Sequence, residues 1–243
     1  MEKYFGWQIL LEIKESHATV VKRRGEKIFL SNNIIYSKLR DDSIYTRSYW
    51  DYFLPLPSIY DNPKVLIIGL GGGTIPFQMQ KIFGKNIDID VVELDPNMLK
   101  VVDVFLPEKL NANVTIDDGY KFVQRARNKY DVIIMDPFIN AEIPKSFFEQ
   151  KFIENASKAL KSNGILAINY IFSASGMARQ YEFKRKLRKF FNVYVLSYSA
   201  LSSNRIILCS KSMKSKAIFS KLSSNFPIDR ENSFLLKPYR KMG

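Results

Sequence analysis

The sequence predicts an α/β fold, in which a doubly wound, Rossmann-like, mostly parallel sheet follows a small N-terminal antiparallel β-domain. Three observations favour this fold. Short β-rich runs with polar turns fill the first part of the chain. Farther on, apolar runs alternate with helical stretches, and a glycine-rich turn follows the first of these runs. We therefore expect an N-terminal domain over residues 1–60 and a larger domain over residues 61–243.

The N-terminal β-domain is predicted from four runs rich in β-branched and aromatic residues. They cover residues 7–13, 18–22, 26–30 and 33–37. Polar turns such as "KRRGE" separate them, a pattern typical of a small antiparallel sheet. The prolines of "LPLPSIYDNPK", residues 54–64, prevent a helix there and mark the change of pattern.

Seven buried strands are predicted after this boundary. Their residues are 65–69, 87–94, 113–117, 130–136, 164–170, 193–199 and 205–210. Helical stretches lie between most of them, and strands that alternate with helices form parallel sheets covered on both faces. In such a sheet, ligands bind beyond the carboxyl ends of the strands.

The first of these strands ends in "VLIIGLGGGTIPFQMQ", residues 65–80, which places Gly69, Gly71, Gly72 and Gly73 at a strand-to-helix turn. Glycine permits positive φ angles and lets backbone approach a ligand closely. The turn therefore predicts a nucleotide or nucleoside cradle, although tight packing of a strand on a helix also requires glycine. The GK[ST] ending of a P-loop is absent, which argues against a triphosphate.

Polar residues follow the next two strands at the same expected edge. Glu93, about twenty residues after the glycines, is placed to accept hydrogen bonds from ribose hydroxyls. Asp118 is placed to accept from an exocyclic amine such as adenine N6, and Gly119 opens a helix. The alternative for Asp118 is a helix N-cap.

Asp136, at the end of the strand in "YDVIIMDPF", is the candidate reacting carboxylate. A strand-end Asp that faces a crevice takes a proton from a bound substrate or stabilises positive charge on it. The alternative is that Asp136, which precedes Pro137, only begins a turn.

Composition excludes several classes of protein and site. One cysteine, Cys209, and one histidine, His17, argue against a disulfide framework, a zinc site and a His-based triad, so no metal is expected. The chain has no run of eighteen apolar residues and no signal-peptide pattern at its N-terminus, so we expect a cytoplasmic protein with no membrane contact.

The net charge of +13 is concentrated in the last third of the chain, where 15 Lys and Arg face 3 Asp and Glu from Ser173 onward. The densest segment, "KRKLRKFF" from Lys184, is predicted as a helix with one apolar stripe. That stripe comprises Met177, Tyr181, Leu187 and Phe191. A solvated basic face is favoured over a nucleic-acid site, because no element that would read bases is recognisable.

Several motifs occur in an order that resembles the spermidine synthase (polyamine aminopropyltransferase) family. They are "DDSIYTRSYWDYFLPL", "VLIIGLGGG", "VELDP", "DDGYKF", "YDVIIMD" and "LKSNGILAIN", between about residues 40 and 170. The family's catalytic domain has the fold of class I S-adenosylmethionine-dependent methyltransferases. The resemblance therefore implies an adenosyl cosubstrate, a small-molecule amine acceptor and a homo-oligomer.

The resemblance also implies roles for single residues. Glu93 would hold the ribose, Asp118 would read adenine, and Asp136 would be the base that deprotonates the attacking amine. Tyr45 matches the first Tyr of the family's D-E-x-x-Y segment, and Asn169 stands where the family commonly has Gln. Both are therefore expected at the substrate.

The sequence departs from the family pattern at the substrate ends. Gly72 replaces the Asp of G-G-G-D-G that contacts the amine of decarboxylated S-adenosylmethionine, and Ile139 replaces the second Asp of D-S-S-D-P. Arg47 replaces a Glu, and "SYSALSSNR" replaces the Tyr- and Pro-rich acceptor segment. The pattern is closer to a spermidine synthase-like branch with G-L-G-G-G and D-x-F signatures.

Three functions follow as hypotheses. The first is aminopropyl transfer from decarboxylated S-adenosylmethionine to a polyamine amine, with Asp136 as general base. The second is methyl transfer from S-adenosylmethionine, since backbone N–H groups at Gly72 would accommodate a carboxylate. The third is a protein without catalysis that binds an adenosyl ligand, or nucleic acid through its basic last third.

Overall fold

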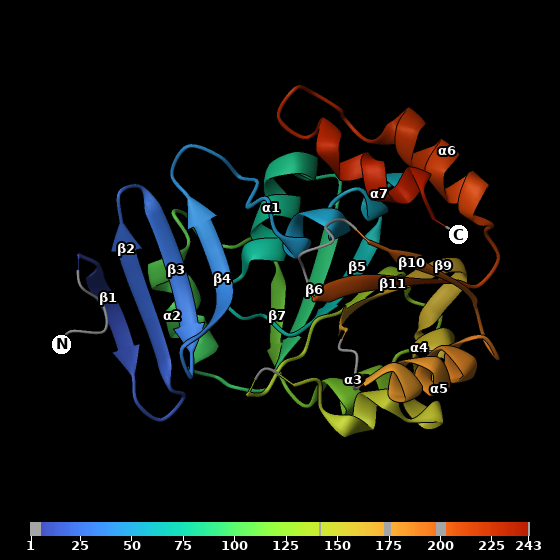
Figure 1. Cartoon of the computed structure of the whole chain (residues 1–243), viewed down its shortest axis with the longest axis horizontal. Coiled ribbons are helices and arrows are strands. Elements are labelled where there is room, and N and C mark those ends of the chain that lie inside the picture. The colour runs from blue at the N-terminus through green and yellow to red at the C-terminus, as the bar shows by residue number, and fades with distance from the viewer. Residues whose placement is uncertain (1–5, 141, 173–175, 198–202, 243) are drawn as a thin grey trace.

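The computed structural model describes residues 6–140, 142–172, 176–197 and 203–242. It contains a four-stranded antiparallel sheet, here called the N-terminal sheet, beside a seven-stranded sheet, here called the large sheet (Figure 1). Helices cover both faces of the large sheet (Figure 1). The predicted fold class is confirmed.

The N-terminal sheet is a meander in which consecutive strands are neighbours. Its strands are β1 (Gln8–Ile13), β2 (Ala18–Arg23), β3 (Glu26–Ser31) and β4 (Ile34–Arg40). Asn32 and Asn33, the two residues between β3 and β4, both have positive φ. That conformation gives a tight hairpin turn whose twist matches the strands. The sheet predicted over residues 7–37 is thus present and extends to Arg40.

The large sheet has the strand order β10-β11-β9-β8-β5-β6-β7. Its strands are β5 (Lys64–Ile68), β6 (Asp88–Glu93), β7 (Asn113–Ile116), β8 (Tyr130–Met135), β9 (Leu160–Ile171), β10 (Asn192–Leu196) and β11 (Asn204–Ser210). Five neighbouring strands are parallel, and β11 pairs antiparallel with both β9 and β10. The chain order reverses between β5 and β8, which is where open α/β sheets bind ligands.

Two hydrophobic cores lie on opposite faces of the large sheet. In β5, Val65 and Ile67 point into one core and Leu66 and Ile68 into the other. The α-helices are α1 (Thr74–Phe83), α2 (Met98–Phe105), α3 (Gly119–Arg125), α4 (Gln150–Ala159), α5 (Met177–Leu187), α6 (Ser215–Asn225) and α7 (Lys237–Arg240). Helices α3, α4 and α5 cover one face, and α1, α2, α6 and α7 cover the other. Cover on both faces explains why the central strands carry consecutive buried apolar residues.

The N-terminal sheet packs onto the large domain through its inner face. Val20 of β2, Phe29 of β3 and Leu39 of β4 belong to the same core as α1 and α2. Lys27 Nζ donates to the carbonyls of Val104 and Phe105 at the end of α2, at 3.0 and 3.2 Å. A cation suits the carbonyl end of a helix, so this contact supports the docking of the two parts.

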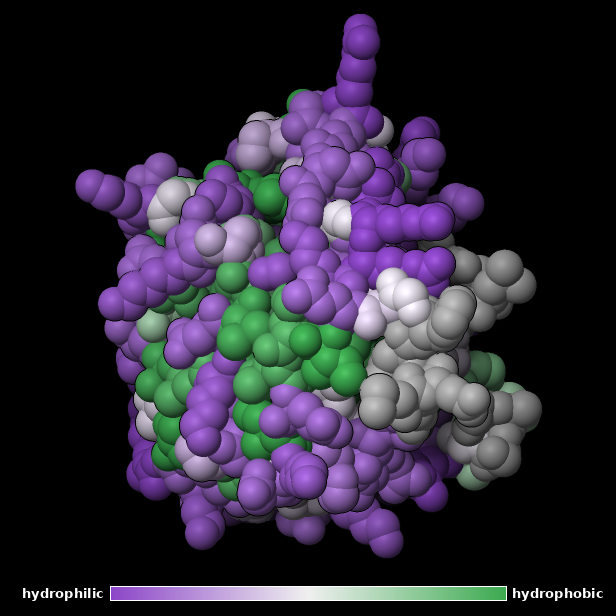
Figure 2. Space-filling view, turned by 90° about the vertical axis from the view of Figure 1, so that its left-hand side faces the viewer, coloured by the Kyte–Doolittle hydropathy of each residue, from purple (hydrophilic) through white to green (hydrophobic). Residues whose placement is uncertain are grey.

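The outward side of the N-terminal sheet has apolar surface (Figure 2). The exposed large apolar side chains of the N-terminal sheet are Ile9, Ile34 and Ile35. The predicted homo-oligomer stays a prediction. Within the described ranges, no helix is long and apolar enough to cross a membrane.

Two 3-10 helices, η2 (Tyr49–Phe53) and η3 (Leu56–Ile59), connect the two sheets. The predicted boundary assigns them to the N-terminal domain, but their apolar side chains enter the core of the large sheet. Buried Asp51 fixes this connection: its Oδ1 accepts from Thr46 Oγ1 at 2.8 Å and from Gln78 Nε2 of α1 at 2.7 Å. Burial raises the pKa of Asp51, and these hydrogen bonds oppose that effect.

The apolar stripe predicted for the basic helix is wrong in part. Helix α5 buries Gln180, Phe183 and Leu187, whereas Met177 and Tyr181 are 59% and 67% exposed. Phe183 lies four positions before Leu187 and three after Gln180, so these residues share the buried face, and Met177 and Tyr181 lie outside it. The basic side chains of α5 make surface contacts, such as Arg185 with Glu182, which fits a solvated face.

Candidate active site

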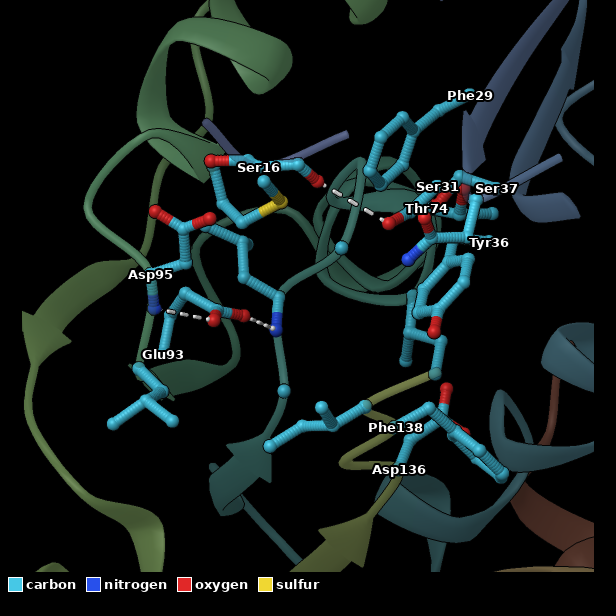
Figure 3. A pocket seen from close by; sticks show the side chains of 18 of the residues that line it. Ser16, Phe29, Ser31, Tyr36, Ser37, Thr74, Glu93, Asp95, Asp136 and Phe138 are labelled. Carbon is cyan, nitrogen blue, oxygen red and sulfur yellow. Dashed lines mark hydrogen bonds between the residues drawn. The ribbon is translucent and has the colours of Figure 1, made fainter. Parts of the chain in front are cut away.

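A pocket of about 290 Å³ lies at the carboxyl ends of β5, β6 and β8, where the strand order reverses. We call it the first pocket. The large sheet contributes the turn after β5, Glu93 and Asp95 after β6, and Asp136 after β8 (Figure 3). The N-terminal sheet and η2 form the opposite wall with Phe29, Tyr36, Ser37, Tyr49 and Trp50. The pocket therefore needs both sheets.

A second, smaller pocket of about 170 Å³ lies beside the first, toward α3. Its walls include apolar side chains, the carboxylate residue Asp118 and the backbone of Gly119. The residues that line both pockets are Gly69, Leu94, Glu93, Phe138 and Ile139. The two pockets thus form one elongated site along the ends of the strands, and an elongated ligand with one flat apolar end fits this shape.

Gly69 and Gly71 of the glycine turn, residues 69–73, line the first pocket. Gly69 has a φ of +94°, and a Cβ there would lie 2.6 Å from the carbonyl oxygen of Asp136. Only glycine allows β5 and β8 to end so close together. Asp136 N also donates to Ile68 O at 3.0 Å, so the end of β8 is held against the start of the glycine turn.

Gly72 and Gly73 do not line either pocket, so the structure does not bring the whole predicted cradle together. Gly72 N donates to Ser37 Oγ of β4 at 2.9 Å, and a Cβ on Gly72 would lie 2.8 Å from Ser37 Cβ. Gly73, with a φ of +79°, is the N-cap of α1. These two glycines serve packing, which corrects the expectation that Gly72 presents a bare N–H to a ligand.

Glu93 lies between the glycine turn and the loop after β6. Its Oε2 accepts from Leu70 N at 2.8 Å, and its Oε1 accepts from Asp95 N at 2.9 Å (Figure 3). Each carboxylate oxygen has a second lone pair, so both can still accept from a ligand hydroxyl. Glu93 is thus held in place at the junction of the two pockets.

Asp118 is the N-cap of α3, as the alternative interpretation proposed. Its Oδ1 accepts from Tyr120 N at 2.7 Å and from Lys121 N at 3.2 Å. The residue also lines the second pocket, so capping fixes one carboxylate oxygen beside the pocket. A Cβ on Gly119 would lie 2.6 Å from Ile68 Cγ2, which explains the glycine at this position.

Asp136 is held by two side chains from different parts of the chain. Asn169 Nδ2 of β9 donates to its Oδ1 at 2.7 Å, and Tyr49 OH of η2 donates to its Oδ2 at 3.3 Å. Burial raises the pKa of Asp136 to about 7, against the opposing effect of these hydrogen bonds. The residue still lines the first pocket, so a carboxyl group whose pKa is raised to about 7 faces the pocket.

Comparison with known proteins assigns the chain to a family. The model of the spermine/spermidine synthase domain matches residues 52–221. The chain belongs to the spermine/spermidine synthase family. The fold agrees: spermidine synthase from Thermotoga maritima superposes with a TM-score of 0.68 and 16% identity, over 94% of this chain and 87% of that chain.

Two curated relatives of this chain are named for different transfer reactions. A polyamine aminopropyltransferase of Vibrio vulnificus is 30% identical over 67% of this chain and 56% of its own length. An N-terminal histidine N-methyltransferase of Emericella nidulans is 34% identical over 47% of this chain and 21% of its own length. The chain thus spans little more than half of the first relative and about a fifth of the second.

Tyr45, the match to the family's D-E-x-x-Y motif, is not brought to either pocket. Its ring is buried against Phe234, and its hydroxyl accepts from Asn232 Nδ2 at 2.9 Å. Tyr49, four residues later, occupies the pocket wall instead. The sequence contains both tyrosines, but their spacing does not tell which one faces the pocket, because Tyr45 lies before the 3-10 helix η2 and Tyr49 begins it.

Asn169 is also placed differently from its expected role at the substrate. It is fully buried and lines neither pocket, and its Nδ2 donates a hydrogen bond to Asp136. Its Oδ1 accepts from Asn204 Nδ2 of β11 at 2.9 Å, which fixes the orientation of the Asn169 amide. Sequence reasoning missed Asn204, because strands β9 and β11 pair across 35 positions. Part of the expected acceptor segment, residues 198–202, lies outside the described residues.

We predict that Glu93→Ala weakens binding of an adenosyl ligand by about 1–3 kcal/mol, the usual effect of losing a charged hydrogen-bond partner. Titration calorimetry with methylthioadenosine measures this change. Glu93→Gln keeps the length and one carbonyl oxygen, so a smaller loss is expected. Unchanged affinity of a folded Glu93→Ala protein would contradict this place for the ribose.

Proposed function

We propose that this spermine/spermidine synthase family member is a transferase that moves an alkyl group from the sulfonium of an adenosyl cosubstrate to an amine. The observation that carries the proposal is Asp136, held by Asn169 and Tyr49 with a pKa of about 7, at the end of an elongated site. The names of relatives favour aminopropyl transfer to a polyamine. In that form the cosubstrate is decarboxylated S-adenosylmethionine.

The residues present fit an adenosyl group. The second pocket offers apolar walls and the capped carboxylate of Asp118 for the adenine. Glu93, at the junction, offers two acceptors for the ribose hydroxyls. The sulfonium end then extends into the first pocket toward Asp136. The cosubstrate supplies the electrophilic carbon, and the protein supplies orientation and a base.

Asp136 has one chemical task in this proposal. An amine is mostly protonated at neutral pH, and only its free form has the lone pair that attacks. Ionised Asp136 takes the proton, the amine nitrogen bonds to the carbon, and the sulfur–carbon bond breaks. The bonding electrons stay on sulfur, which becomes a neutral thioether. A base with a pKa near 7 is well matched to this task.

Methyl transfer from S-adenosylmethionine is the second candidate. The observation that favours it is Gly72, which stands where an aminopropyltransferase-type Asp would contact the cosubstrate's amine and which is closed off by Ser37. A relative named as a methyltransferase is consistent with it. In the first pocket, Glu15, Glu93, Asp95 and Asp136 would attract a cationic acceptor in either reaction.

One experiment separates these functions. The purified protein is incubated with each cosubstrate and a panel of amines, and the nucleoside product is identified. Methylthioadenosine supports aminopropyl transfer, and S-adenosylhomocysteine supports methyl transfer. Tight cosubstrate binding without either product would support the hypothesis of a binding protein. Steeply salt-dependent binding of RNA would instead favour a role for the basic last third.

We predict that Asn169→Ala moves the acid limb of the activity profile to higher pH by roughly one unit. The Asn169 amide stabilises ionised Asp136, so its removal raises the pKa of Asp136 above 7. The measurement is kcat/KM from pH 5.5 to 9. Tyr49→Phe, which removes the longer hydrogen bond, should shift the limb less. An unshifted limb in both variants would contradict Asp136 as the titrating base.

A further inference from the structure

Thr74, the first residue of α1, carries a hydroxyl that no other group satisfies within the part of the chain that the structure describes. Its side chain is 2% exposed, and its Oγ1 is buried without a hydrogen-bond partner among the described residues. An unsatisfied buried hydroxyl costs about 1–3 kcal/mol. Thr74 nevertheless lines the first pocket, beside Ser37 and Tyr36 (Figure 3). This position suggests that a ligand supplies the missing partner.

The backbone around Thr74 adds further donors. Helix α1 has ten residues, and its N-cap, Gly73, has no side chain to satisfy the first turn. Gly73 N donates to Leu70 O, and Phe77 N donates to Gly73 O. Pro76 has no N–H, so within the described residues the N–H groups of Thr74 and Ile75 are left without an acceptor. These donors and the helix dipole favour an anion.

The rest of the first pocket limits which anion fits. Glu15, Glu93, Asp95 and Asp136 all line it, and together they oppose a phosphate or another group that is only negative. The end of an amino acid has one carboxylate and one ammonium. Its carboxylate suits the start of α1, and its ammonium suits the acidic side chains.

We propose that the start of α1, with Thr74, binds the α-carboxylate of the cosubstrate, so that the protein selects S-adenosylmethionine over its decarboxylated form. This proposal rests on the proposed function, because it assumes an adenosyl ligand in the same site. It decides between the two transfer reactions in favour of the methyl group. Gly72, which offers no cation anchor, agrees with this choice.

The test compares four ligands by titration calorimetry: S-adenosylmethionine, its decarboxylated form, S-adenosylhomocysteine and methylthioadenosine. The two ligands that keep the carboxylate should bind at least tenfold more tightly than the decarboxylated form. Thr74→Val should weaken both by roughly tenfold, the effect of one hydrogen bond to a charged group. Binding of methylthioadenosine, which lacks the amino acid end, should not change.

Thermal melting without ligand supplies a second readout. Because Thr74 Oγ1 has no hydrogen-bond partner among the described residues, Thr74→Val should melt at or above the wild-type temperature. Thr46→Val is the matched control: the Thr46 hydroxyl donates to Asp51, so this variant should melt lower and keep the wild-type ligand ranking. A lower melting temperature for Thr74→Val would mean that Thr74 has a structural partner and would overturn the proposal.

Two binding results would also overturn it, and they are distinguishable from failure of the proposed function. Equal affinity of wild-type protein for S-adenosylmethionine and its decarboxylated form would refute the carboxylate site while leaving an adenosyl site intact. An equal loss of methylthioadenosine binding in Thr74→Val would do the same. No binding of any of the four ligands would refute the proposed function as well.

Discussion

Asp136→Asn should lower turnover by roughly 10²–10⁴-fold, the usual contribution of a general base, while changing affinity for the adenosyl cosubstrate by less than about threefold. Asparagine keeps the shape of the side chain, and its carbonyl oxygen can still accept from Asn169 Nδ2. Only the negative charge and the capacity to take a proton are lost. Single-turnover kinetics and calorimetry on one preparation measure both quantities.

Asp131→Asn is the matched control, because Asp131 is the second residue of the same strand, β8, at the end away from the pockets. Its carboxylate accepts from Lys64 N and Lys161 Nζ, so this variant should lose stability but keep its turnover per folded molecule. Turnover that survives in Asp136→Asn would leave Asp136 a turn residue. Loss of both turnover and binding would make it a cosubstrate ligand.

Asp136→Asn should also change how the free energy of unfolding depends on pH. The pKa of Asp136 is about 7 in the folded protein and near 4 in the unfolded chain. Between about pH 4 and pH 7 the folded state binds more protons than the unfolded state, so the free energy of unfolding of the wild type falls as pH rises. Asp136→Asn has no carboxyl group at this position, so this decrease is absent. We expect the variant to be more stable at pH 8, on the order of 2 kcal/mol, and much less so at pH 5. Urea unfolding at both values measures the difference.

Gly69→Ala should lower the free energy of unfolding by about 3 kcal/mol and weaken cosubstrate binding at least tenfold. The added Cβ would lie 2.6 Å from the carbonyl oxygen of Asp136, which is backbone and cannot rotate away. The two strand ends must then separate, and the base moves away from the glycine turn. Urea unfolding and calorimetry measure the two effects.

Gly84→Ala is the control for backbone strain alone. Gly84 also has a positive φ, +57°, but a Cβ there has no atom within 4 Å. We expect a loss of only about 1 kcal/mol and normal cosubstrate binding. Equal losses in the two alanine variants would show that the close approach of Gly69 to Asp136 is unimportant.

The strands were predictable because each carries a local signal. The runs of β5, β6 and β8 each hold consecutive buried apolar residues, as strands covered on both faces do, and each ends at a glycine or a carboxylate. The position of Asp136 at the edge of the sheet followed from that pattern alone. The start of α1 was likewise marked by Gly73.

The parts of the site that were missed depend on contacts between distant segments. Asn204 reaches Asn169 only because β11 lies beside β9, and Ser37 reaches Gly72 only because the N-terminal sheet docks on the glycine turn. Tyr49 reaches Asp136 as the first residue of the 3-10 helix η2, whereas Tyr45 lies before this helix and packs against Phe234. Side-chain identity does not determine such pairings, so the sequence offered no signal for them.

The hydrogen bond from Gly72 N to Ser37 Oγ joins the large sheet to the N-terminal sheet, so exchange of the Gly72 amide reports whether the two sheets are docked. Opening of the N-terminal sheet away from the large sheet would expose the Gly72 amide and remove one wall of the first pocket in a single event. A ligand that needs both walls binds only the closed form. Saturating ligand should therefore slow deuterium exchange at this amide by the factor 1 + [L]/Kd, while amides on the outer strand β1 keep their rates wherever they exchange by local fraying.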